Sequence, residues 1–304
     1  MLLQVFCFVL SIIGLYFGAE LSLESSEKVG KSWRLSPLLI GMFIVGFGTS
    51  LPELFVSQLA CLRGIPSMAI GNIIGSNIAN IFLILGVSSI IYALGLEGKE
   101  INKQFKFHLV LCFLMWIFIY RGEINLITTI VLGIFMAFYF YLNLSSNEIK
   151  DVEKIDVSKF DYVKIIIGFA LLYASGELLV YSGANIGREW GVSEFAISAI
   201  FVAFGTSFPE LVTALLACYR KKDTNLIIGN IIGSNIFNGA FVLGSIGFYQ
   251  FRLDNVFTNE MVALVGVSIL FILFNFFKVR ISRRYSVLFL GTYSVFVYWW
   301  LNQS

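Results

Sequence analysis

The sequence predicts an all-α membrane protein of about ten transmembrane helices, built as two inverted five-helix repeats with both termini extracellular or periplasmic. Three observations predict this fold class: an apolar composition, a series of helix-length apolar segments and a repeated motif. Of 304 residues, 58% are hydrophobic and 13% are charged, against roughly 45–50% and about 25% in a soluble domain. A soluble core cannot bury that much apolar surface, so the lipid bilayer is an expected partner.

The apolar segments divide the chain into two similar halves. A helix needs about 20 apolar residues to span the hydrocarbon core. Segments of this kind cover residues 2–23, 36–62, 67–95, 105–120, 124–144, 162–187, 193–219, 225–250, 257–277 and 285–302. The one long polar segment follows the fifth of them. We therefore expect a first repeat over 1–144, a cytoplasmic linker over 145–161 and a second repeat over 162–304.

Basic residues predict the orientation of these helices. Of the 21 Lys and Arg residues, 17 fall at odd-numbered connections between spans, and the even-numbered connections hold only Arg63, Arg121, Arg188 and Arg252. Positive charge is concentrated on the cytoplasmic side of membrane proteins. The odd connections are therefore expected in the cytoplasm, and the chain is expected to be a multi-pass protein of the cell membrane.

Charge and cysteine content exclude several classes of function. The net charge is only +2 and the Lys/Arg runs are short, so no surface for nucleic acid is expected. The four cysteines lie in apolar stretches without metal-ligand spacing, which indicates small buried residues rather than a disulfide or zinc framework. No cofactor is predicted.

A motif occurs twice, once in each half. FGTSLPEL begins at Phe47 and FGTSFPEL at Phe204, and each is followed by a GNIIGSN segment. Glu53 and Glu210 are 157 residues apart. Because each half holds five helices, an odd number, the second copy enters the membrane upside down. Inverted repeats with polar breaks at matching places are typical of secondary transporters whose site lies near the midplane.

Glu53 and Glu210 are the acidic residues of this motif, and they fall well inside apolar segments. A charged side chain at the bilayer centre costs ~2.5–3.5 kcal/mol on insertion scales and is usually functional. Two carboxylates brought together repel each other unless a cation lies between them. Oxygen donors suit a hard ion such as calcium. The single histidine, His108, is expected at a helix end with a solvated role.

Proline residues are expected to break both acidic helices. Pro52 and Pro209 cannot donate a backbone hydrogen bond, and such breaks are tolerated where the helix lines a cavity. Hydroxyl side chains lie three and four residues before each glutamate, where they share its face. These are Thr49, Ser50, Thr206 and Ser207.

Polar residues also form a stripe on the following helix of each half. Asn72, Ser76 and Asn80 are spaced by four residues, and Asn230, Ser234 and Asn238 repeat that spacing. Glycine pairs nearby permit close helix contact. The stripe therefore lines a shared ion site or, alternatively, joins helices through hydrogen bonds.

GTSLPE at 48–53, GTSFPE at 205–210 and the twin GNIIGSN segments at 71–77 and 229–235 resemble the signature regions of the sodium/calcium exchanger family of cation antiporters. The resemblance implies antiport of calcium and sodium. It implies that Glu53, Glu210 and the backbone oxygens of Thr49 and Thr206 bind calcium. For sodium it implies Ser50, Ser76, Ser207 and Ser234 with the carbonyls of Gly46 and Ala203. From their spacing in the stripe, Asn72, Asn80, Asn230 and Asn238 are expected to line the site.

One residue departs from the family pattern, because some sodium-coupled members have Asp where this chain has Asn238. A proton- or potassium-coupled cation antiporter is the alternative within the transporter class. A membrane-embedded enzyme could use Glu53 and Glu210 as an acid and a base, but that role needs unlike surroundings, and these motifs are nearly duplicate. A channel is disfavoured because channel pores gather like subunits around an axis. The chain is therefore predicted not to be an enzyme.

Overall fold

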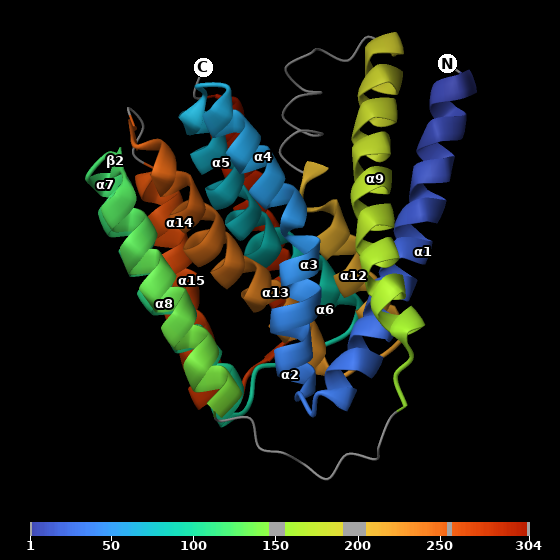
Figure 1. The fold of residues 1–304 in the computed structure, drawn as a ribbon, viewed down its shortest axis with the longest axis horizontal. Helices are drawn as coiled ribbons and strands as arrows, with labels where there is room; N and C mark the ends of the chain where they lie inside the picture. Colours follow the sequence, from blue (N-terminus) through green and yellow to red (C-terminus); the bar gives the residue numbers. More distant parts are fainter. Residues whose placement is uncertain (1, 146–155, 191–204, 254–256, 303–304) are drawn as a thin grey trace.

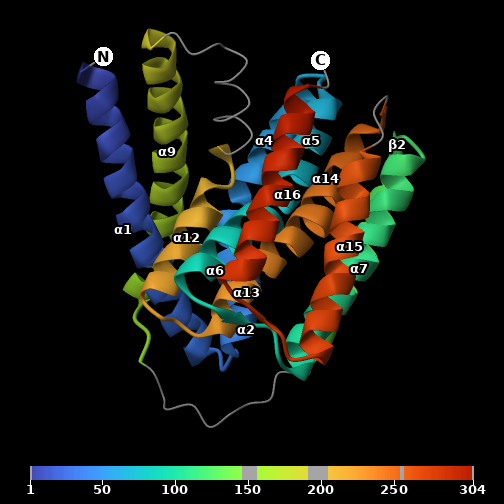
Figure 2. The same ribbon diagram turned by 180° about the vertical axis from the view of Figure 1, so that it is seen from behind.

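The computed structural model describes residues 2–145, 156–190, 205–253 and 257–302, and over these residues the chain is almost entirely helical (Figure 1). Helix α1 (Leu2–Ser32) starts and α16 (Arg283–Leu301) ends at one end of the molecule, whereas α8 (Leu126–Ser145) ends and α9 (Lys159–Glu189) starts at the other (Figures 1 and 2). This arrangement agrees with a bundle that crosses a membrane many times.

Two long helices, α1 (Leu2–Ser32) and α9 (Lys159–Glu189), pack side by side along one edge of the bundle (Figures 1 and 2). Both contain 31 residues. Glycines allow their close approach: a Cβ atom at Gly18 would lie 2.9 Å from the backbone nitrogen of Leu172, and one at Gly168 would lie 2.7 Å from that of Ser22. The two helices therefore pack backbone to backbone at these glycines.

The second predicted span is broken, as its proline suggests. It comprises α2 (Pro37–Ile40), the π-helix η1 (Gly41–Gly46), α3 (Phe47–Thr49) and α4 (Leu51–Leu62). The helix axis bends by 41° between Thr49 and Leu51. Pro52 sits in the first turn of α4, where its missing N–H is tolerated. The bend therefore lies two residues before Pro52.

The remaining elements of the first half follow in order: α5 (Pro66–Ile78), the π-helix η2 (Ala79–Ile84), α6 (Leu85–Ile91), β1 (Leu94–Gly95), α7 (Lys99–Tyr120), β2 (Glu123–Ile124) and α8 (Leu126–Ser145). The second half continues after α9 with α12 (Phe208–Tyr219), α13 (Thr224–Ile236), the π-helix η4 (Phe237–Val242), α14 (Leu243–Ile246), the short η5 (Gly247–Tyr249), β3 (Phe251–Arg252), α15 (Thr258–Phe276), β4 (Arg280–Ile281) and α16 (Arg283–Leu301). Helices α5 and α13 form the buried centre, and apolar side chains face outward from the surrounding helices.

Short strands link the two halves. Strand β1 pairs antiparallel with β4 through Leu94 and Ile281, and β2 pairs with β3 through Ile124 and Phe251. Adding 157 to 94 gives 251, and subtracting 157 from 281 gives 124. An offset of 157 residues, which is the spacing of the two motifs, therefore converts the β1–β4 pair into the β2–β3 pair. This is the relation expected if a two-fold axis relates the two halves.

Seven described helices are long and apolar enough to cross a membrane, or eight if the bent pair is one span. These correspond to eight of the ten predicted segments. Within the described residues, α12 is a shorter apolar helix, and α16 is not among the seven. Residues 193–204 of the predicted span 193–219 lie outside the described residues. The count of ten stays a prediction.

Candidate ion-binding site

The two motif glutamates lie at equivalent positions near the starts of two helices. Glu53 lies in the first turn of α4 and Glu210 in the first turn of α12, and both are fully buried. The residue before each helix has nearly the same backbone, with φ −88° and ψ 7° at Ser50 and φ −90° and ψ 4° at Ser207. The repeated sequence therefore folds into repeated local geometry.

The two motifs are joined by hydrogen bonds across the bundle. The Ser50 hydroxyl donates to Glu210 Oε1 at 2.9 Å, and the Ser207 hydroxyl donates to Glu53 Oε1 at 3.3 Å. Each serine thus bonds to the glutamate of the other motif rather than to that of its own. This exchange brings the two carboxylates into one site formed by both halves of the chain.

Several oxygens of the acidic motifs and the polar stripe have no hydrogen-bond partner. Glu53 Oε2 and Glu210 Oε2 are buried without one, and so are both amide atoms of Asn80 and Asn238. No ion pair among the described residues includes either glutamate. Buried polar atoms without partners call for an explanation, and carboxylate and amide oxygens are ligands for hard cations. The donor set fits a bound cation.

The polar stripe of the first half is hydrogen-bonded to the acidic motif of the second half. The Thr206 hydroxyl donates to Asn72 Oδ1 at 3.1 Å, and it lies 3.4 Å from the Ser76 hydroxyl. The Asn72 amide donates to the Glu53 carbonyl at 3.2 Å and to the Ser57 hydroxyl at 3.1 Å. These bonds fix residues of both halves around the first glutamate.

The polar stripe of the second half makes matching contacts with the broken span of the first half. The Thr49 hydroxyl lies 3.5 Å from both Asn230 Oδ1 and the Ser234 hydroxyl. The Ser234 hydroxyl donates to the Gly46 carbonyl at 3.1 Å, and the Asn230 amide donates to the Thr213 hydroxyl at 3.3 Å. In each case, therefore, the stripe of one half contacts the acidic motif of the other half.

Two hydroxyl residues of this network were missed by the sequence reasoning. Ser57 and Thr213 support the stripe amides from the acidic helices. They lie four and three residues after their glutamates, so a helical-face argument could have found them. The predicted residue Ala203 lies outside the described residues. Within the described chain, no group of three or more His, Cys, Asp or Glu residues could hold a metal, so a cation here would depend on neutral oxygens as well.

The two stripe asparagines whose amide groups lack hydrogen-bond partners lie in wide, π-helical turns. Asn80 lies in η2 and Asn238 in η4, both π-helical. Segment η2 packs against α12, and η4 packs against α4. Each asparagine is therefore carried by a segment that contacts the glutamate-bearing helix of the other half. Short π-helical segments often occur at functional sites.

Glycines bring the second polar stripe close to the broken span. A Cβ atom at Gly229 would lie 2.3 Å from the Leu38 carbonyl oxygen, and one at Gly233 would lie 2.6 Å from the Met42 Cα. Close contact at this predicted small-residue pair is confirmed. A Cβ atom at either residue of the matching pair, Gly71 or Gly75, would have no described atom of another helix within 4 Å.

The expectation for His108 was wrong. The residue lies within α7 and is only 1% exposed. Its Nδ1 lies 2.7 Å from the Ser268 hydroxyl, and its Nε2 lies 3.3 Å from the Asn235 amide nitrogen. The ring is held by these contacts inside the bundle. Cys61, Cys112 and Cys218 are buried as predicted.

The fold and site define a class: a multi-pass membrane protein with two repeated acidic motifs facing each other inside an apolar bundle. Residues 3–145 and 161–302 match the sequence model of the family described as sodium/calcium exchanger protein. The chain belongs to this family, and the predicted resemblance is confirmed. The family is one of exchangers, which is consistent with a protein that is not an enzyme.

Individual relatives and a solved structure agree with this assignment. An uncharacterized membrane protein of Methanocaldococcus jannaschii is 33% identical over 306 residues, covering 97% of both chains. The sodium/calcium exchanger MaX1 of Methanosarcina acetivorans is 24% identical over 348 residues, covering 95% of this chain and 97% of the relative. A structure of the sodium-calcium exchanger NCX_Mj, soaked with Na⁺ and Sr²⁺, superposes with a TM-score of 0.85 at 32% identity and 97% coverage of both chains.

Proposed function

We propose that this protein exchanges calcium for sodium across the cell membrane, by alternating access to one site between its two repeats. The observation that carries the proposal is the reciprocal pair of bonds from Ser50 to Glu210 and from Ser207 to Glu53. These bonds draw two fully buried carboxylates together without a basic partner in the described chain. A divalent cation between them offsets both charges, which removes the repulsion.

The neighbouring groups divide into a calcium set and a sodium set. Calcium is bound by the two glutamates with the backbone oxygens of Thr49 and Thr206. Sodium is bound at flanking sites by Ser50, Ser76, Ser207, Ser234, Gly46 and Ala203. The site is lined by Asn72, Asn80, Asn230 and Asn238, and the prolines Pro52 and Pro209 keep the adjoining backbone open. The hydrogen bond from Ser234 to the Gly46 carbonyl supports the second of these sets.

The repeats supply the two-sided access that exchange requires. We assign residues 1–144 and 162–304 to two inverted repeats and 145–161 to a cytoplasmic linker, with both termini outside. The exchange of strand pairs under the 157-residue offset supports the two-fold relation. The positions of the ends of α1, α8, α9 and α16 support an odd number of spans in each half (Figures 1 and 2).

Proteoliposomes containing the purified protein test this function. Calcium uptake is measured with an outward gradient of sodium, of potassium or of protons. Of these three gradients, we expect only the sodium gradient to raise calcium uptake above the level measured without a gradient. Equal uptake with and without the gradients would contradict antiport, and uptake that needs potassium or protons would move the protein to the alternative antiporter class.

A further inference from the structure

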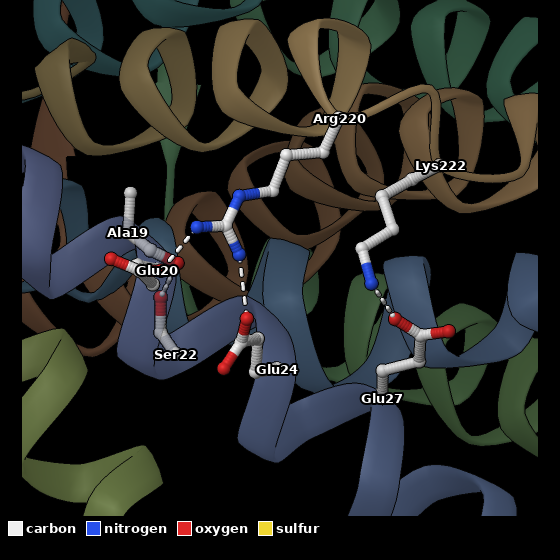
Figure 3. Close-up of polar contacts among 7 residues, drawn as sticks. All are labelled: Ala19, Glu20, Ser22, Glu24, Glu27, Arg220 and Lys222. Carbon is white, nitrogen blue, oxygen red and sulfur yellow. Dashed lines mark hydrogen bonds and ion pairs between the residues drawn. The ribbon is translucent and has the colours of Figure 1, made fainter.

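Three acidic residues on one face of α1 meet two basic residues from the connection between α12 and α13. Glu20, Glu24 and Glu27 are spaced by four and three residues, which aligns them along the helix. Figure 3 shows Arg220 reaching Glu20 and Glu24, and Lys222 reaching Glu27. The Arg220–Glu24 distance is 2.5 Å and the Lys222–Glu27 distance is 2.6 Å.

The connection that carries these basic residues is held in a defined shape. The Lys222 backbone nitrogen donates to the Ala217 carbonyl at 2.9 Å, and Lys221 adopts a positive φ of 51°. The side chains of Arg220 and Lys222 are 27% and 26% exposed, so water screens them only in part. The ion pairs therefore tie α1 to the end of a glutamate-bearing helix.

The internal repeat identifies the counterpart of this cluster. Adding 157 to 20 gives 177, and adding 157 to 63 gives 220, so Glu177 of α9 and Arg63 after α4 match Glu20 and Arg220. The turns match as well: the Ile65 backbone nitrogen donates to the Ala60 carbonyl at 2.9 Å, like Lys222 to Ala217. The counterpart connection therefore has the same backbone geometry.

The counterpart is not formed in this structure. No ion pair joins Glu177 to Arg63, although both residues are described, and both are exposed. It also contains fewer charges. The positions that match Glu24, Glu27 and Lys222 are Tyr181, Ala184 and Ile65. The two matched clusters thus differ both in whether they are paired and in the number of charges that they contain.

We propose that the α1 cluster is a latch that closes the cytoplasmic end of the protein, and that Glu177 and Arg63 form a weaker latch at the opposite end in the alternate state. This inference rests on the proposed alternating access. Opening the cytoplasmic end requires α1 to move away from the α12–α13 connection, which breaks the cluster. Because its charges outnumber those of the counterpart, the empty protein favours the state described here.

Distances between two spin labels test the latch without any transport measurement. The labels are attached to cysteines placed at Trp33, after α1, and at Phe277, after α15, since both side chains are exposed. The four native cysteines are replaced by alanine. In the purified protein without calcium we expect one main distance. Exposed ion pairs contribute little individually, so the double change Arg220→Gln and Lys222→Gln is expected to raise the population at a second distance about three- to tenfold.

Two matched variants separate the latch from a general loss of structure. Arg220→Lys keeps the charge and is expected to retain the parent distribution, whereas Arg63→Gln is expected not to raise the second population. An unchanged distribution in the double Gln variant, or an equal shift with Arg63→Gln, would overturn the latch. A shift in a protein that fails to exchange calcium for sodium would keep the latch and refute the proposed function.

Discussion

Replacing Glu210 by Gln removes one of the two charges that we assign to calcium. Glutamine keeps the size of the side chain and one acceptor oxygen. At 4 Å and an effective dielectric constant of about 20, two unit charges attract by about 4 kcal/mol, and a divalent ion doubles this to about 8 kcal/mol. If desolvation offsets half of that energy, calcium binding weakens by about 4 kcal/mol, which is about a thousandfold in Kd.

Calorimetric titration of the purified variant with calcium measures this change, and calcium uptake into proteoliposomes measures its consequence. Glu260→Gln is the matched control. Glu260 is a buried glutamate of α15 that belongs to neither motif and accepts a hydrogen bond from Trp300 Nε1 at 2.7 Å. The control is expected to bind calcium as the parent does. A Glu210→Gln variant whose Kd stays within about threefold of the parent would refute the assignment of this carboxylate.

Three further changes probe the neutral ligands, the stripe and the orientation. Ser50→Ala leaves Glu210 Oε1 without its donor, so thermal unfolding should show that the free energy of unfolding falls by about 1–3 kcal/mol. Unchanged stability would show that this hydrogen bond does not stabilise the protein. Asn238→Asp adds a third carboxylate, which like-charged neighbours make easier to protonate. Calcium flux in this variant should therefore fall more steeply at mildly acidic pH, and superimposable pH profiles of parent and variant would exclude residue 238 from the site. A cysteine replacing Ser146 should be protected from an impermeant thiol reagent in intact cells, whereas one replacing Arg63 should be labelled. The reverse pattern would overturn the orientation.

Local chemistry made much of the fold and site predictable from the sequence. Apolar length predicts helices in a bilayer, and Pro52 predicts the break because it lacks a donor. The repeated motif predicts Glu53 and Glu210 as partners because neither has a nearby basic residue. These inferences depend on residues a few positions apart, where sequence spacing determines geometry.

Contacts between distant segments were not predictable in the same way. The bond from Ser50 to Glu210 joins residues 160 positions apart, and spacing along one helix cannot reveal it. The π-helical turns at Asn80 and Asn238 have no periodic signal of their own. His108 was misplaced because the predicted span began at residue 105, which put the histidine at a helix end. Helix α7 begins at Lys99 instead, and Ser268 and Asn235 hold the ring in the interior.

Simultaneous measurement of both ions in one vesicle population distinguishes coupled exchange from two separate fluxes. Vesicles are loaded with labelled sodium, the membrane potential is clamped, and calcium entry and sodium exit are followed together. We expect each flux to require the opposing ion, and both fluxes to vanish together in Glu210→Gln while Glu260→Gln retains them. Calcium entry that continues without sodium exit would contradict exchange of calcium for sodium.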